Sequence, residues 1–167
     1  MAKKSDKKYL DRWAMFRENI SRSTPIDLKE TEIAKHKRIK EQEANYEKWF
    51  EYYFPNFYTH KPMPFHIKAS KRVIENSEWF EVRSWSREMA KSARTMMEVL
   101  YLCFTKKKKT WLMISNTLEN ATRLLVPYKN ILESNNRLIN DYGVQEQIGK
   151  WEEHEFTSRY GFSFRAL

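Results

Sequence analysis

Residues 85–92 read Trp-Ser-Arg-Glu-Met-Ala-Lys-Ser, and this stretch decides which fold the sequence predicts. It follows residues 78–84, an apolar and aromatic run that alternates as a strand does, and it precedes residues 93–104, which have the composition of a buried helix. A strand, a tight loop ending in Lys-Ser and a helix together form the layout of a phosphate-binding loop. Amides at a helix start hold phosphates, the lysine reaches the β- and γ-phosphates, and the next hydroxyl can ligate Mg²⁺.

The match to the general glycine-rich pattern is imperfect. Trp85 stands where the first glycine would be, and Ala90 replaces the second. The same eight residues also fit an ordinary helix start, with Ser86 as the N-cap and Glu88 favouring the helix dipole. Both interpretations stay open on this stretch alone, so the flanking elements must decide.

Composition narrows the class of protein. A chain of 167 residues has room for one ordinary domain, and its 3 glycines argue against a β-sandwich or barrel with many tight turns. The net charge of +9 favours contact with a polyanion such as nucleic acid, although a solvated basic surface would give the same charge. The single cysteine, Cys103, lies in an apolar run and is expected to be a packed core thiol. No apolar run approaches the roughly 18 residues of a membrane span, so we expect no membrane association and a cytosolic location.

The N-terminal third divides near residue 45. Residues 1–45 are rich in charge and predict a helical arm, which is either solvated or used for docking near DNA. Residues 46–65 are dense in aromatic side chains, which favours core packing where the arm joins the domain, with base stacking as the alternative. Phe65 and His66 precede the first predicted strand, which makes them candidates to line an adenine pocket.

The C-terminal half predicts further strands and helices. The lysine run 106–109 reads as a solvated loop, and residues 110–115 read as a strand buried on both faces of a parallel sheet. A helix follows from residue 118, and strands at 155–157 and 162–167 are joined around Gly161 as in a hairpin. The order strand, loop, helix, strand, helix implies a βαβα unit with parallel strands. The predicted class is therefore α/β, with residues 46–167 as the globular part.

Three features resemble the large terminase subunit of tailed bacteriophages and prophages, the ATPase that drives DNA into a preformed capsid. The variant phosphate loop of that family is matched by the residues Ser86, Arg87, Glu88, Met89, Ala90, Lys91 and Ser92. Residues 114–125 resemble the next βα unit of the family, and residues 53–66 resemble its aromatic and proline-rich lead-in. The resemblance implies a P-loop NTPase fold of three layers around a mainly parallel sheet.

The resemblance also implies roles and partners. Lys91 would hold the β- and γ-phosphates of ATP, Ser92 would ligate Mg²⁺, and Arg87 would be the catalytic sensor of the γ-phosphate, while the amides of residues 88–92 complete the cradle. The implied partners are double-stranded DNA, a small terminase subunit, the portal and further copies in a ring. The implied location is the cytoplasm of the bacterial host.

One departure limits the expected activity. Hydrolysis in such a fold needs an acidic residue at the end of a later strand, and the only aspartate after the loop, Asp141, lies in a turn setting. The sequence therefore predicts the N-terminal part of a terminase ATPase, cut before that strand, which binds nucleotide without turnover. A basic nucleic-acid-binding module and a small helical adaptor are the two alternatives.

Overall fold

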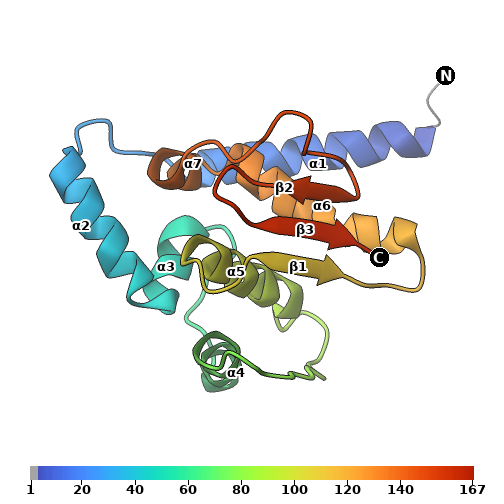
Figure 1. Cartoon of the computed structure of the whole chain (residues 1–167), viewed down its shortest axis with the longest axis horizontal. Coiled ribbons are helices and arrows are strands. Elements are labelled where there is room, and N and C mark those ends of the chain that lie inside the picture. Colours follow the sequence, from blue (N-terminus) through green and yellow to red (C-terminus); the bar gives the residue numbers. More distant parts are fainter. Residues whose placement is uncertain (1–3) are drawn as a thin grey trace.

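The computed structural model describes residues 4–167, so residues 1–3 of the predicted arm lie outside the described residues. Seven helices and three short strands make up the described chain (Figure 1). The helices are α1 (Lys4–Ser23), α2 (Glu32–Glu43), α3 (Tyr46–Tyr53), α4 (Pro64–Glu75), α5 (Lys91–Phe104), α6 (Leu118–Ser134) and α7 (Asn136–Tyr142). The strands are β1 (Thr110–Met113), β2 (Glu155–Thr157) and β3 (Ser163–Ala166).

The predicted fold class is wrong. The described chain is mostly helical, and its one sheet has the order β1-β3-β2, with a parallel pair and an antiparallel pair. A three-layer fold around a mainly parallel sheet is therefore absent from residues 4–167. The physical reason is that local patterns predict where strands can form, whereas a parallel sheet exists only where each strand finds neighbours to satisfy its backbone hydrogen bonds.

Residues 78–84 show this most clearly, because they form no strand and no sheet pairing among the described residues. The period of two that predicted a strand is present, but the charged side chains of Glu81 and Arg83 turn inward. Phe80 and Val82 face solvent, with 87% and 74% of their surfaces exposed. The segment leading into the loop is thus held by side-chain contacts and not by a sheet.

The short sheet confirms part of the prediction for the C-terminal half. β1 pairs in parallel with β3, and β2 and β3 form the expected antiparallel hairpin, in which Phe156 lies opposite Phe164 and Gly161 adopts a φ of +96° in the connection. However, β1 is an edge strand, and Leu112 is 53% exposed. The prediction of a strand buried on both faces is therefore wrong.

The aromatic segment around α3 forms the centre of the core. Trp49, Phe50, Tyr53 and Phe54 are almost completely buried, and the ring of Trp49 lies 5.5 Å from the ring of Tyr101 on α5. α5 itself is buried continuously from Met96 to the end of the helix. Core packing is thus confirmed for these aromatic side chains, which are too enclosed to stack on nucleic-acid bases.

Both helices of the predicted arm pack against the C-terminal half. α1 runs along α6 (Figure 1), where the guanidinium of Arg17 donates a 2.8 Å hydrogen bond to the Asn130 side chain. α2 is attached through Arg38, which forms an ion pair with Asp141 on α7. The predicted division at residue 45 stays a prediction, but the two helices are docked and not free in solvent.

Two expectations about burial can be compared with the structure. Cys103 is buried, as predicted for a core thiol, and its burial raises the pKa of the thiol far above its ordinary value. In the part of the chain that the structure describes, no helix combines the length and the apolar character that crossing a membrane requires.

Candidate phosphate-binding site

The backbone before α5 forms a loop and not an early helix start. α5 begins at Lys91, and its N-cap is Ala90, which has no side-chain oxygen to bond the first-turn amides. The alternative in which Ser86 caps a helix is therefore wrong. Ala90 has a φ of +52° and Glu88 a φ of +69°, both in the left-handed region that non-glycine residues rarely occupy.

Alternating left-handed residues have a specific chemical consequence. Glu88 and Ala90 are both left-handed with Met89 between them, and left-handed residues occur in the backbone turns that bind anions through successive N–H groups. Each strained residue costs about 1–3 kcal/mol, and such strain is concentrated at functional sites. The first turn of α5 follows directly and leaves its first amides without a side-chain cap.

The loop encloses a hollow of about 470 Å³ that is lined by residues 85–93 alone. Arg87, Lys91 and Ser92 are exposed at this hollow. Among the described residues, neither Arg87 nor Lys91 has an ion-pair partner, so both cations are available to a ligand. The predicted site residues from Ser86 to Ser92 all line this hollow, and their role in binding stays a prediction.

α4 holds the loop from one side. Nδ1 of His66 accepts a hydrogen bond from the Met63 amide, which makes Nε2 the protonated nitrogen of the neutral ring, and Nε2 lies 3.0 Å from the carbonyl oxygen of Met89. The ring of Trp85 lies 5.1 Å from the ring of His66 and 5.1 Å from the ring of Phe65. The contact with the Met89 carbonyl and the ring contacts of Trp85 attach the loop to α4.

A buried polar cluster lies at the base of the loop, and the sequence analysis missed it. Arg94 and Glu98 on α5 are 3% and 2% exposed, and Arg83 forms an ion pair with Glu98 at 2.8 Å. Ser70 of α4 bonds both Glu98 and Arg94. The sequence did contain one signal for this cluster. Glu98 is the single acid within the apolar run 96–104, and a buried acid needs a buried partner.

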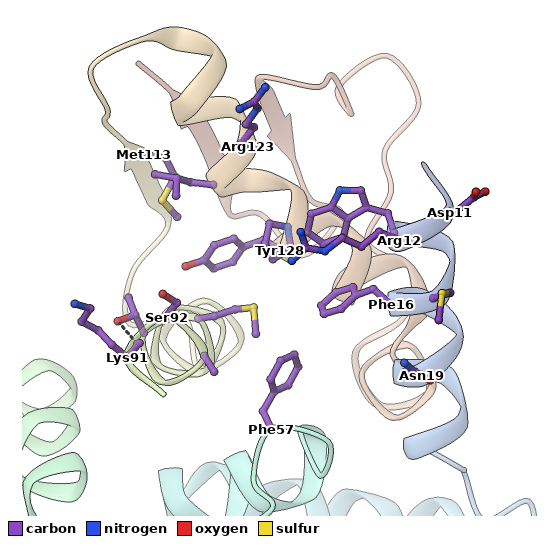
Figure 2. Close-up of a pocket in the computed structure, with 17 residues that line it drawn as sticks. Asp11, Arg12, Phe16, Asn19, Phe57, Lys91, Ser92, Met113, Arg123 and Tyr128 are labelled. Carbon is purple, nitrogen blue, oxygen red and sulfur yellow. Dashed lines mark hydrogen bonds between the residues drawn. The ribbon is translucent and has the colours of Figure 1, made fainter. Parts of the chain in front are cut away.

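A larger cavity of about 880 Å³ lies beside the first turn of α5 and shares residues 91–93 with the hollow of the loop. Figure 2 shows three aromatic side chains around this space, namely Phe16 of α1, Phe57 from the segment after α3, and Tyr128 of α6. Lys91 and Ser92 lie on the wall that α5 forms. Most of its lining is apolar. Phosphates need donors, which the hollow of the loop offers through Arg87, Lys91 and Ser92, whereas the larger cavity holds Arg12 and Arg123 within a mostly apolar lining.

Asp141 has a structural role in this molecule. Its side chain is fully buried and accepts hydrogen bonds from Arg38 at 2.6 Å and from the hydroxyl of Tyr53 at 2.7 Å. It lies in the last turn of α7, whereas the sequence predicted a turn setting for it. Within residues 4–167, no group of three or more His, Cys, Asp or Glu side chains is arranged to hold a metal ion.

The lysine run 106–109 is exposed, as predicted for a solvated loop. Lys106 lies over the ring of Tyr160 and Lys107 over the ring of Tyr101, with the ammonium nitrogens 4.9 Å and 5.6 Å from the ring centres. These lysines lie at the end of α5 opposite the phosphate loop.

No family model, curated protein or solved structure matches this chain.

Proposed function

We propose that residues 85–92 bind the phosphates of ATP together with Mg²⁺. The observation that carries the proposal is the loop backbone, in which two left-handed non-glycine residues and an uncapped helix start lie along one hollow. This site needs no particular sheet, because its donors come from the loop and from α5. The proposal therefore does not depend on the P-loop NTPase fold that the structure contradicts.

Each side chain of the loop has a role that its chemistry supports. Lys91 reaches the β- and γ-phosphates as a point charge, and Arg87 offers a planar donor fork to the γ-phosphate. Ser92 supplies one hydroxyl, which suits a Mg²⁺ ion whose other ligands are phosphate oxygens and water. The half-buried rings of Phe65 and Trp85 lie next to the loop and offer a stacking surface for the adenine.

The wider role is proposed from the resemblance of residues 86–92 and 114–125 to the large terminase subunit. In that role the chain forms the ATP-binding part of a motor that moves viral DNA into a capsid, in the cytoplasm of the bacterial host. Its partners would be double-stranded DNA, the small terminase subunit, the portal and other copies of the large subunit in a ring. The net charge of +9 is compatible with a DNA partner.

We expect nucleotide binding without turnover by this chain. In ATPases of the kind that the loop resembles, an acidic residue at the end of a later strand binds Mg²⁺ and a neighbouring acid orients the attacking water. The only aspartate after the loop, Asp141, is fully buried and bonded to Arg38 and Tyr53.

The test is a titration of a fluorescent ATP analogue with Mg²⁺ against the wild type, Lys91→Ala and Lys109→Ala. Lys109 is an exposed lysine of the solvated run, so its replacement is the control for losing one positive charge. We expect Lys91→Ala to weaken binding at least tenfold, because a hydrogen bond to a charged group contributes about 1.5–3 kcal/mol. Equal affinities for Lys91→Ala and Lys109→Ala would refute the proposed site.

Titrating DNA against the same three proteins distinguishes the proposed nucleotide site from the alternative of a basic nucleic-acid-binding module. Such a module binds DNA with an affinity that falls steeply with salt, and its affinity does not depend on Lys91. The burial of Trp49, Phe50 and Tyr53 removes part of the aromatic cluster on which that alternative was built, whereas the lysine run 106–109 stays exposed.

A further inference from the structure

We infer that Arg83, held by the buried carboxylate of Glu98, is a positioning residue that sets the shape of the phosphate loop; the inference rests on the proposed phosphate site. Arg83 lies two residues before the loop, and its side chain is 9% exposed. Its guanidinium bonds two residues of α5, the helix that follows the loop. The two ends of the loop are thereby joined through one side chain.

The first set of contacts joins Arg83 to the helix side of the loop. One guanidinium nitrogen lies 2.8 Å from Glu98 Oε2, and the other donates to the hydroxyl of Thr95 at 3.1 Å. The Thr95 hydroxyl in turn donates to the carbonyl oxygen of Lys91 at 3.0 Å. Arg83 is thus two hydrogen bonds from the backbone of the lysine that is proposed to bind the phosphates.

The second contact joins Arg83 to the start of the loop. Its guanidinium carbon lies 5.1 Å from the centre of the Trp85 ring, close enough for a cation–π interaction. Trp85 also packs against His66, whose ring lies within hydrogen-bonding distance of the Met89 carbonyl. Fixing Trp85 and Met89 from outside holds the left-handed residues Glu88 and Ala90 in their strained conformation.

Glu98 is suited to this task because its surroundings fix it. Its Oε1 accepts from the Ser70 hydroxyl at 2.5 Å, and Ser70 also accepts from Nε of Arg94 at 2.7 Å. Arg94 continues the cluster to Glu47 on α3, where both its terminal nitrogens are bonded. The carboxylate therefore cannot rotate away from Arg83 without breaking bonds that join α3, α4 and α5.

Two replacements keep size while removing the interaction. Arg83→Met removes the charge and the donors, and Glu98→Gln leaves one oxygen for the two donors Ser70 and Arg83. Glu155→Gln is the matched control, because Glu155 pairs with Arg165 at an exposed site on the sheet. Affinity for the fluorescent ATP analogue with Mg²⁺ is measured for the wild type, the control, both single variants and the double variant.

We expect each single variant to lose about tenfold in nucleotide affinity, as for one hydrogen bond to a charged group. The double variant is expected to bind no more weakly than the weaker single variant, since residues that act as one unit give non-additive losses. Affinities equal to those of the wild type, or losses that add fully, would overturn the inference.

Amide hydrogen exchange provides a readout that needs no nucleotide. The amide of Arg94 donates to the carbonyl oxygen of Ala90 in the first turn of α5. Exchange in residues 94–96 should become faster in Arg83→Met while exchange in α6 stays unchanged. Unchanged exchange in residues 94–96, or equal acceleration in α6, would show that Arg83 does not act on the loop.

The two readouts separate the two proposals. A wild type that binds no nucleotide would remove the proposed function, and the exchange of residues 94–96 would then decide the role of Arg83 by itself. A wild type that binds nucleotide, with variants that bind equally well, would leave the proposed function standing and remove the role of Arg83.

Discussion

Replacing Asp141 by Asn tests whether the only aspartate after the loop is structural or binds metal. The carboxylate is fully buried and receives two hydrogen bonds from Arg38, at 2.6 Å and 2.9 Å, one from Tyr53 at 2.7 Å and one from the Asn140 side chain at 2.9 Å. An Asn side chain has one oxygen for these four hydrogen bonds, and its amide hydrogens would face a donor such as the guanidinium. Asp141→Asn should therefore reduce stability and leave nucleotide binding intact.

The expected loss follows from the burial of the pair. Removing one partner of a buried ion pair costs about 3–5 kcal/mol. Arg38 is 18% exposed and keeps Glu30 at 2.7 Å as a second partner, so the cost falls toward the lower end of that range. A loss of about 3 kcal/mol in a chain of this length lowers the Tm by roughly 6–12 °C.

The assay combines thermal unfolding with the nucleotide titration. Glu155→Gln is again the control, because its exposed pair with Arg165 should contribute less than about 1 kcal/mol. An unchanged Tm for Asp141→Asn would contradict the structural role. Loss of Mg²⁺-dependent nucleotide binding at an unchanged Tm would show instead that Asp141 serves the metal.

Three further predictions concern stability. Hydrogen bonds from Arg38 hold the pKa of Glu30 below its ordinary value. The stability that the Glu30–Arg38 pair contributes is therefore present above about pH 4.3 and is lost as the pH falls. Urea unfolding should show that the stability of Glu30→Gln depends less on acid pH than that of the wild type. Ala90→Gly removes a left-handed alanine at φ +52° and should raise stability by about 0.5–1 kcal/mol in urea unfolding, with nucleotide affinity retained. Phe164→Ala empties a fully buried site and should cost about 3–5 kcal/mol, measured in the same way.

The local elements were largely predictable from the sequence. α6 begins after Thr117, whose side chain bonds the Asn120 amide, and its apolar spacing was recognised in advance. The hairpin around Gly161 needed only two short apolar strands and one residue with a positive φ. Caps, periodicity and turns depend on residues close together in the chain, and for this reason a single sequence predicts them.

The candidate site was predictable in its residues but not in its geometry. The sequence placed Lys91 and Ser92 at the start of a helix, but the left-handed backbone of Glu88 and Ala90 was not indicated by any local pattern. His66 reaches Met89 across 23 positions of the chain, and Arg94 reaches Glu47 across 47. Such contacts depend on how α3, α4 and α5 pack.

The sequence by itself predicted the hairpin and most of the helices, α3 excepted, because their signals lie within a few residues of one another. Only the tertiary structure decided that residues 78–84 form no strand and that β1 is an edge strand, because pairing depends on neighbours distant in the chain. It also decided that Arg83 turns inward to Glu98 while Phe80 faces solvent. A buried carboxylate needs a charged partner, and here that need outweighs the local preference for burying the apolar side chain.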